Sequence, residues 1–216
     1  MFSMIRMSKI LLCTLNSKYI HSSLAIRSLK AYVESRTEFT VDIKEYTINQ
    51  NNSDIMADIY GYRPDVLGFS CYIWNIRPIL ELCADYKKVA PDTIIILGGP
   101  EVSYDAELLL TENLFIDYVI RGEGEVTLKE LIGGIYNQAA LKSIAGISYR
   151  KNDQVQSNCD REYINPLDEI PFVYTDEMET LQDRVVYYES SRGCPFWCAY
   201  CLSANSRPVR HLSMTR

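Results

Sequence analysis

The stretch Thr93-Ile94-Ile95-Ile96-Leu97-Gly98-Gly99-Pro100 decides the fold of this chain. Its first five residues are β-branched or aliphatic, and their number suits a strand that is buried on both faces, as in the centre of a parallel sheet. The two glycines and the proline then end the strand in a turn, because glycine tolerates backbone conformations that other residues avoid. The stretch therefore predicts a central parallel strand that ends in a sharp turn.

Apolar runs and amphipathic segments alternate on both sides of this stretch. Strands are expected at residues 9–15, 39–46, 66–70, 93–97 and 117–120, and helices at 23–36, 54–60, 76–89, 104–110 and 125–136. Such alternation predicts a parallel sheet with helices on both faces. Five such units match a flavodoxin-like (Rossmann-like) doubly wound sheet of five strands in the order 2-1-3-4-5. A hairpin over residues 144–150 and 155–158 is expected to close this domain.

Three turns with small residues follow the third, fourth and fifth expected strands. They are Ser70-Cys71-Tyr72, Gly98-Gly99-Pro100 and Arg121-Gly122-Glu123-Gly124-Glu125. The carboxyl ends of parallel strands share one edge of the sheet, where ligands of doubly wound folds bind. The turns therefore predict a ligand pocket at this edge. Each turn also has a purely structural interpretation, as a tight connection or as a helix start where acidic residues favour the dipole.

A cysteine loop lies near the end of the chain, in Ser191-Arg192-Gly193-Cys194-Pro195-Phe196-Trp197-Cys198-Ala199-Tyr200-Cys201. The spacing is C-x3-C-x2-C, and thiolates are soft ligands that favour iron–sulfur clusters, zinc or copper(I). A structural zinc ion wants four ligands, and His211 is the only candidate nearby for the fourth. Three ligands on one loop fit a [4Fe–4S] cluster with one iron left open. A chance cluster or a partial zinc knuckle is the alternative.

The cysteine spacing, with Tyr200 just before the last cysteine, resembles the motif of the radical S-adenosylmethionine (radical SAM) family. The resemblance implies that Cys194, Cys198 and Cys201 hold a [4Fe–4S] cluster whose open iron binds S-adenosylmethionine. It implies that one electron from the cluster cleaves that cofactor to a 5′-deoxyadenosyl radical. Tyr200 is then expected to pack over the cluster or over the adenine.

The strand-end turns resemble those of cobalamin-binding domains. Ser70-Cys71-Tyr72 is similar to their S-x-L element, with Tyr72 in place of leucine, and Gly98-Gly99 is similar to their G-G element. Together with Arg121-Gly122-Glu123-Gly124-Glu125, these turns look like the cobalamin-dependent radical SAM subgroup. The cobalamin-binding residues that this resemblance implies are Ser70, Tyr72, Gly98, Gly99, Gly122 and Gly124. Tyr72 and Trp74 are either aromatic neighbours of the corrin or ordinary core residues.

The turn after the first strand departs from the wider cobalamin-domain pattern. That pattern, D-x-H-x-x-G, supplies a histidine to cobalt, whereas this chain has Asn16-Ser17-Lys18-Tyr19-Ile20-His21-Ser22-Ser23. The aspartate and the glycine are missing. We therefore expect this loop to pack under the corrin without ligating cobalt, and we interpret His21 as a neighbour of a helix cap at Ser22 or Ser23. Ligation of cobalt by His21 is the alternative.

Composition, charge and cysteine usage indicate the cell compartment and the kinds of partner to expect. The chain of 216 residues is 47% hydrophobic and 23% charged, as is ordinary for a soluble globular protein. Its net charge of −6 disfavours a nucleic-acid surface, and the apolar run at residues 10–15 is too short to span a membrane. Cys13, Cys71, Cys83 and Cys159 show no disulfide spacing, and together with the cysteine loop this favours a reducing cytoplasm.

The resemblance covers nearly all of the chain and implies the amino-terminal portion of a longer enzyme. We expect a cobalamin-binding domain at residues 1–158, a linker at 159–184, and the start of a radical SAM barrel at 185–216, with a strand at 185–189. The group includes methyltransferases and the anaerobic oxidative cyclase of magnesium-protoporphyrin monomethyl ester. The implied partners are a small-molecule substrate and an electron donor such as flavodoxin or ferredoxin. The alternatives are a cobalamin-binding module without chemistry of its own, and a radical SAM enzyme whose flavodoxin-like domain binds no cofactor.

Overall fold

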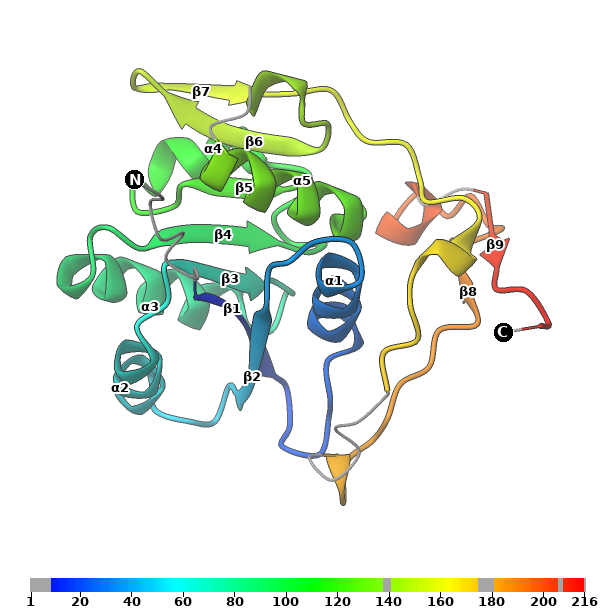
Figure 1. Cartoon of the computed structure of the whole chain (residues 1–216), viewed down its shortest axis with the longest axis horizontal. Helices are drawn as coiled ribbons and strands as arrows, with labels where there is room; N and C mark the ends of the chain where they lie inside the picture. Colours follow the sequence, from blue (N-terminus) through cyan, green and yellow to red (C-terminus); the bar gives the residue numbers. More distant parts are fainter. Residues whose placement is uncertain (1–8, 138–140, 175–180, 206–207, 216) are drawn as a thin grey trace, which may run out of the picture.

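A seven-stranded sheet in the order β2-β1-β3-β4-β5-β6-β7 forms the centre of the computed structural model (Figure 1), which describes residues 9–137, 141–174, 181–205 and 208–215. The strands are β1 (Ile10–Asn16), β2 (Val41–Thr47), β3 (Val66–Ser70), β4 (Ile94–Gly98), β5 (Tyr118–Ile120), β6 (Ile147–Lys151) and β7 (Gln154–Ser157). The helices are α1 (Leu24–Glu34), α2 (Asn52–Tyr62), α3 (Ile76–Val89), α4 (Ala106–Glu112) and α5 (Gly124–Asn137).

Strands β1 to β5 are parallel and follow the predicted order 2-1-3-4-5, which confirms the doubly wound fold. The predicted hairpin also forms, as β6 and β7. The hairpin belongs to the same sheet, because β6 pairs with β5 in the antiparallel sense. The sheet therefore has seven strands, of which the first five are parallel.

Helices cover both faces of the sheet, which explains why the central strands read as unbroken apolar runs. All residues of β1 and β3 are buried. Odd-numbered β1 residues, such as Leu11 and Leu15, pack in the core beneath α2, α3 and α4, whereas Ile10 and Leu12 pack beneath α1 and α5. Successive side chains of a strand point to opposite faces, so a strand between two helical layers is buried on both faces and is mostly apolar.

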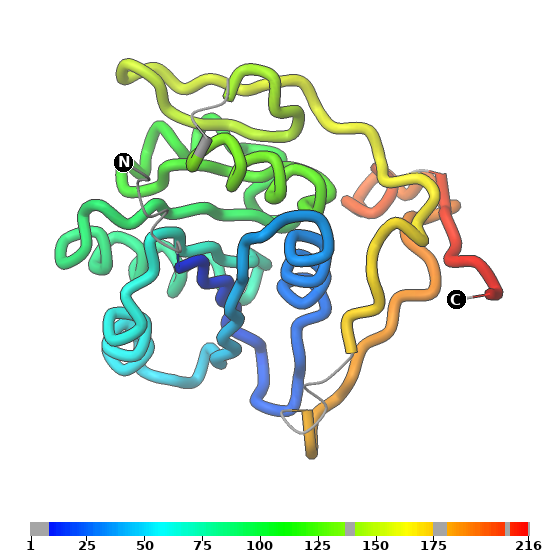
Figure 2. Tube along the Cα trace, in the orientation of Figure 1, coloured from blue at the N-terminus to red at the C-terminus, as the bar shows by residue number. Residues whose placement is uncertain are grey.

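The end of the chain runs along the outer side of α1, on the right in Figure 1 and in orange and red in Figure 2. Here β8 (Ser191–Arg192) pairs with β9 (Arg210–His211) in a small antiparallel ladder. The prediction of a strand at residues 185–189 is wrong: Val185 makes a single bridge with His21, and residues 186–189 belong to no strand. A strand needs a partner for its backbone groups, and the described residues offer none at this place. Residues 175–180 of the predicted linker lie outside the described part.

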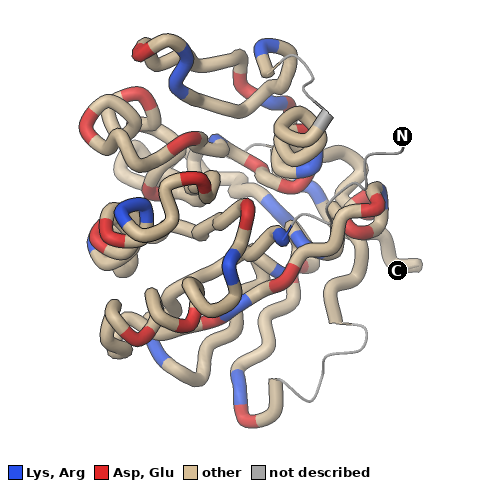
Figure 3. Tube along the Cα trace, turned by 60° about the vertical axis from the view of Figure 1, so that its left-hand side comes forward, with Lys and Arg blue, Asp and Glu red and all other residues tan. Residues whose placement is uncertain are grey.

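Acidic and basic residues are interspersed along the chain in Figure 3. Ion pairs join several neighbouring elements. Lys44 on β2, for example, lies 2.7 Å from Asp58 on α2, and Lys87 on α3 lies 2.8 Å from Asp117 before β5. Among the described residues, no helix is both long and apolar enough to cross a membrane.

Candidate functional site

The carboxyl ends of β3, β4 and β5 lie side by side. Ser70, the last residue of β3, is paired in register with Gly98, and Gly98 is paired with Ile120 at the end of β5. The turns that were singled out in the sequence leave the sheet immediately after these positions. The structure therefore brings the Ser70, Gly98-Gly99 and Gly122–Gly124 turns to one edge.

Close backbone contacts join these turns. The Cys71 amide donates a 2.7 Å hydrogen bond to the Gly98 carbonyl, and Gly99 has a φ of 112°. A Cβ atom on Gly99 would lie 2.5 Å from the Cys71 carbonyl oxygen, so only glycine fits there. Ser103 Oγ donates to the Gly99 carbonyl at 2.8 Å and accepts a 3.3 Å hydrogen bond from the Gly122 amide. This serine links the second turn to the third.

A cavity of about 400 Å³ opens at this edge and continues between the sheet and helices α1 and α5. All six residues that the sequence assigned to cobalamin line it, namely Ser70, Tyr72, Gly98, Gly99, Gly122 and Gly124. Its deeper wall consists mainly of apolar side chains, among them Leu12, Ile96 and Leu128.

Glycines in the lining of this cavity either let its walls pack closely or leave part of its space open. A Cβ atom on Gly68 would lie 2.6 Å from Leu12 Cδ2, and one on Gly124 would lie 3.0 Å from Leu29 Cδ2. At Gly98 the nearest atoms to an added Cβ belong to Ile120, at 3.7 Å, so a branched side chain there would take up space in the cavity. A deep, mainly apolar slot with a glycine rim fits the nucleotide tail of a cobalamin.

A second cavity, of about 390 Å³, lies beside the first at the ends of β1 and β3. This is the point where the strand order reverses, which is where doubly wound folds bind ligands. Tyr72 lines both cavities. Its ring stacks on Trp74 with centroids 4.6 Å apart and planes 3° from parallel, and Trp74 lines the second cavity. The two aromatic residues are therefore at the mouth of the site rather than in the core.

His21 also lines the second cavity, and its ring is hydrogen-bonded. Its Nδ1 atom lies 2.6 Å from the hydroxyl of Tyr187, a residue of the carboxyl-terminal segment. The His21 carbonyl accepts a hydrogen bond of 2.9 Å from Asn16 Nδ2. No carboxylate is among these hydrogen-bond partners of His21, whereas a carboxylate beside a metal-ligating histidine raises the basicity of the ring.

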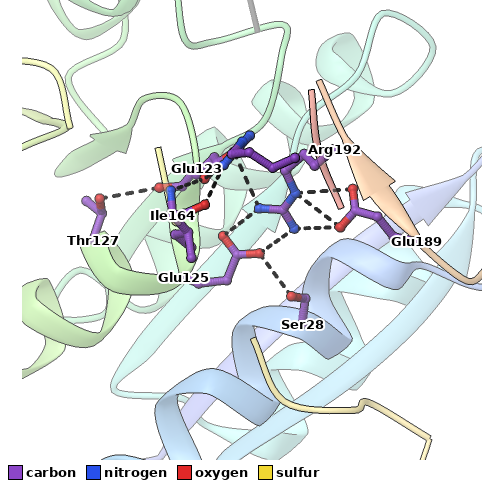
Figure 4. A network of polar contacts seen from close by, with 8 residues as sticks. Ser28, Glu123, Glu125, Thr127, Ile164, Glu189 and Arg192 are labelled. Carbon is purple, nitrogen blue, oxygen red and sulfur yellow. Dashed lines mark hydrogen bonds and ion pairs between the residues drawn. The ribbon is translucent and has the colours of Figure 1, made fainter. Parts of the chain in front are cut away.

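A network of charged side chains forms one wall of the first cavity (Figure 4). Arg192 Nη2 lies 2.8 Å from Glu125 Oε1 and 2.8 Å from Glu189 Oε2, and Glu125 also accepts a 2.9 Å hydrogen bond from Ser28 on α1. Burial by itself would raise the pKa of Glu125, but the charge and the hydrogen bonds of Arg192 outweigh it and hold that pKa below its usual value. Sequence reasoning missed this network: it interpreted Glu125 as part of the glycine turn at the ligand edge or, alternatively, as a helix start.

The three cysteines of the loop are accessible. Cys194 and Cys198 are half-buried and Cys201 is exposed, while the side chain of Tyr200 is 92% exposed and does not line either cavity. Within the described ranges, no three His, Cys, Asp or Glu side chains are grouped so that they could hold a metal ion. The thiol donor set suits an iron–sulfur cluster in its chemistry, but the described loop does not have the geometry of a cluster site. The assignment of Cys194, Cys198, Cys201 and Tyr200 stays a prediction.

Comparison with known proteins gives the family. Residues 10–132, more than half of the chain, match the B12 binding domain family. The chain is 34% identical over 157 residues to an uncharacterized methyltransferase of Pyrococcus horikoshii, covering 70% of this chain and 34% of that protein. It is 32% identical over 161 residues to an anaerobic magnesium-protoporphyrin IX monomethyl ester cyclase of Synechocystis, covering 69% and 32%.

A solved structure shares the fold. The cobalamin-dependent S-adenosylmethionine radical enzyme OxsB, with aqua-cobalamin and S-adenosylmethionine bound, superposes with a TM-score of 0.78 at 22% identity, over 96% of this chain and 30% of OxsB. The chain thus spans about a third of the length of each of these three proteins. On the match over residues 10–132, the chain belongs to the B12 binding domain family, in the group that includes cobalamin-dependent radical SAM enzymes.

Proposed function

We propose that this chain is the cobalamin-binding portion of a radical SAM enzyme that transfers a methyl group to an unactivated carbon or remodels it by radical chemistry. The observation that carries the proposal is the glycine-rimmed cavity at the ends of β3, β4 and β5, which all six assigned residues line. Cobalamin bound there supplies methyl-transfer chemistry. The chain's own residues supply the slot for its tail and the walls that orient it.

The two cavities suit the two parts of the cofactor. The first is deep and mainly apolar, as a nucleotide tail requires, and the second lies at the strand-order reversal, with Tyr72 and Trp74 as aromatic walls for the corrin. Both cavities share Leu24, Ala25 and Tyr72, so one extended ligand can occupy them together.

The cysteine loop supports the second half of the proposal. Its C-x3-C-x2-C spacing provides the donor set for a [4Fe–4S] cluster that binds S-adenosylmethionine in the complete enzyme. We propose a cytoplasmic protein that receives electrons from a donor such as flavodoxin or ferredoxin and acts on a small-molecule substrate.

Titration with hydroxocobalamin tests the proposal. The wild-type chain should bind it, as followed by the visible spectrum and equilibrium dialysis. Gly98→Val should weaken binding at least tenfold, because the side chain fills part of the first cavity. Gly61→Val on α2 is the matched control, since a Cβ there meets nothing within 4 Å and the residue lines neither cavity. Equal binding by both variants would contradict the assignment of the pocket.

The same titration separates the alternatives. A domain that binds no cofactor would leave the visible spectrum of hydroxocobalamin unchanged in the wild-type chain. A module that binds cobalamin without chemistry of its own would bind it, while the complete protein would show no cobalamin-dependent turnover of S-adenosylmethionine. Substitution of any one loop cysteine by alanine should abolish cleavage of S-adenosylmethionine in the complete, anaerobically reconstituted enzyme.

A further inference from the structure

Two arginines hold the base of the cysteine loop. Arg192 on β8 and Arg210 on β9 are directly paired in the small ladder, and the loop that contains all three cysteines leaves and returns through this ladder. Cys194 follows Arg192 by two residues. Whatever fixes the two arginines therefore fixes both ends of the loop.

Both arginines reach across to the start of α5, Arg210 to the residue just before the helix and Arg192 to its first turn. Arg210 is bound to Glu123 at 2.5 Å and 3.0 Å, and Arg192 is bound to Glu125 at 2.8 Å and 3.3 Å. Arg192 Nη1 also lies 3.8 Å from Glu123 Oε1, so the two pairs form one network. Two parallel hydrogen bonds between a guanidinium and a carboxylate fix orientation as well as distance.

The network is largely removed from water. The side chains of Arg210, Glu123 and Glu125 are 5%, 10% and 5% exposed, and that of Arg192 is 19% exposed. Charges in such positions are costly unless each has a partner, and removal of one partner leaves an uncompensated buried charge. The network therefore determines where the ladder can lie relative to α5.

The same residues form a wall of the cavity assigned to cobalamin. Glu123, Glu125 and Arg192 line it together with Gly122 and Gly124. An occupant of the cavity therefore touches the side chains that hold the cysteine loop. Coupling between two such sites is reciprocal in binding free energy.

We propose that Glu123 and Glu125 with Arg192 and Arg210 form a clamp that fixes the base of the cysteine loop against the cobalamin pocket and couples occupancy of the pocket to placement of the loop. Arg192 is a positioning residue in this proposal, which rests on the proposed cobalamin binding. The clamp gives cobalamin and the cysteine loop a defined mutual position without any direct bond between them.

Hydrogen–deuterium exchange of the whole chain, with and without hydroxocobalamin, tests the clamp. In the wild type, hydroxocobalamin should slow exchange in peptides from residues 191–205. In Arg192→Gln the peptides should exchange faster without ligand, and hydroxocobalamin should no longer slow them. The affinity for hydroxocobalamin should fall about fivefold or more, as reciprocity requires.

Two further variants keep the test decisive. Arg161→Gln is the matched control, because Arg161 also makes an ion pair with α5, to Glu130, but lines neither cavity; it should behave as wild type. The double variant Glu125→Gln/Arg192→Gln removes both charges of this ion pair, so neither charge stays behind after the loss of the other. If the clamp acts as one unit, the double variant weakens hydroxocobalamin binding no more than whichever of the two single variants, Glu125→Gln or Arg192→Gln, binds it more weakly.

The outcomes separate this proposal from the assignment of the pocket. If the wild type binds hydroxocobalamin but exchange at residues 191–205 does not respond to it, and Arg192→Gln keeps wild-type affinity, the clamp is overturned and the pocket stands. Failure of the wild type to bind hydroxocobalamin overturns both. A purely structural role of Arg192 predicts faster exchange in the variant with an unchanged response to ligand, and this result also overturns the coupling.

Discussion

Gly98 and Gly99 are neighbours with different physical requirements. Gly99 has a φ of 112°, and a Cβ on it would lie 2.5 Å from the oxygen and 2.9 Å from the nitrogen of Cys71. Both contacts are with backbone, which cannot rotate away. Gly99→Ala should therefore lower the free energy of unfolding by about 2–3 kcal/mol, from backbone strain and the displaced Cys71 turn. Urea denaturation followed by circular dichroism measures it.

Gly98→Ala is the control for that measurement. The nearest atoms to its Cβ belong to Ile120 at 3.7 Å, an ordinary van der Waals distance, and its φ is not positive. We expect a change in the free energy of unfolding below about 1 kcal/mol. Similar destabilisation by both substitutions would show that the strand end, and not the close approach to Cys71, sets the requirement for glycine.

His21 tests how cobalt is held. The loop lacks the aspartate and the glycine of the D-x-H-x-x-G pattern, and the His21 ring is bound to the Tyr187 hydroxyl at 2.6 Å rather than to a carboxylate. We expect His21→Ala to leave hydroxocobalamin affinity and the visible spectrum nearly unchanged. The electron paramagnetic resonance spectrum of the cob(II) form is the measurement. Nitrogen superhyperfine splitting that is present in the wild type and disappears in His21→Ala would establish His21 as a ligand.

At the scale of elements, the sequence predicts what depends on neighbours in the chain. Residues 66–70 and 76–89 were expected as a strand and a helix, and β3 and α3 have these bounds. Both are marked by local signals, an unbroken apolar run and an amphipathic repeat. The cap of α1 shows the limit: Ser23 occupies the N-cap position, but its side chain makes no capping hydrogen bond.

The prediction of a strand at residues 185–189 was wrong for a reason that does not lie in the local sequence. Its sequence, Val185-Val186-Tyr187-Tyr188-Glu189, has a high strand propensity. Propensity alone does not supply a partner, and in the described structure this segment is held by side chains and a single bridge to the β1–α1 loop, while Tyr188 is 59% exposed. The order of the parallel strands was predictable, because each of them is followed in the sequence by a helix that local patterns reveal.

The candidate site likewise has one part that the sequence predicted and one part that it did not. The glycine turns were found because parallel strands place their carboxyl ends at one edge, a rule that needs no coordinates. The Arg192–Glu125 contact joins residues 67 positions apart and depends on how the carboxyl-terminal segment lies against α5. The sequence signal for it was an arginine next to the cysteine motif and two glutamates in a glycine turn, but no local rule pairs them.

At the scale of the whole molecule, the carboxyl-terminal segment that begins at Val185 lies against the domain formed by the sheet and its helices. Contacts at two places help to hold the segment: Val185 and Tyr187 bind the β1–α1 loop, and Arg192 and Arg210 bind the start of α5. Between these contacts the segment passes the mouths of both cavities, since Tyr187 lines the second and Glu189 lines the first. The pocket is therefore bounded on one side by the sheet edge and on the other by the approach to the cysteine loop.

The seven cysteines report on both parts in one experiment. Cys13, Cys71 and Cys83 are fully buried in the core beneath α2 and α3, and burial raises the pKa of each of these thiols. The thiolate is the reactive species, so a raised pKa and a closed core both suppress alkylation. We expect a short pulse of iodoacetamide at pH 8, followed by peptide mass mapping, to leave these three unlabelled in the native chain.

The other four cysteines should be labelled in the same pulse. Cys159 and Cys201 are exposed, and Cys194 and Cys198 are half-buried in a loop that does not gather them. Labelling of Cys13, Cys71 or Cys83 at the rate of Cys159 would contradict the packing of the sheet between its helical layers. Protection of Cys194, Cys198 and Cys201 in the metal-free chain would contradict the open conformation of this loop. The two results are independent, because the first depends on the core of the sheet and the second on the segment held by Arg192 and Arg210.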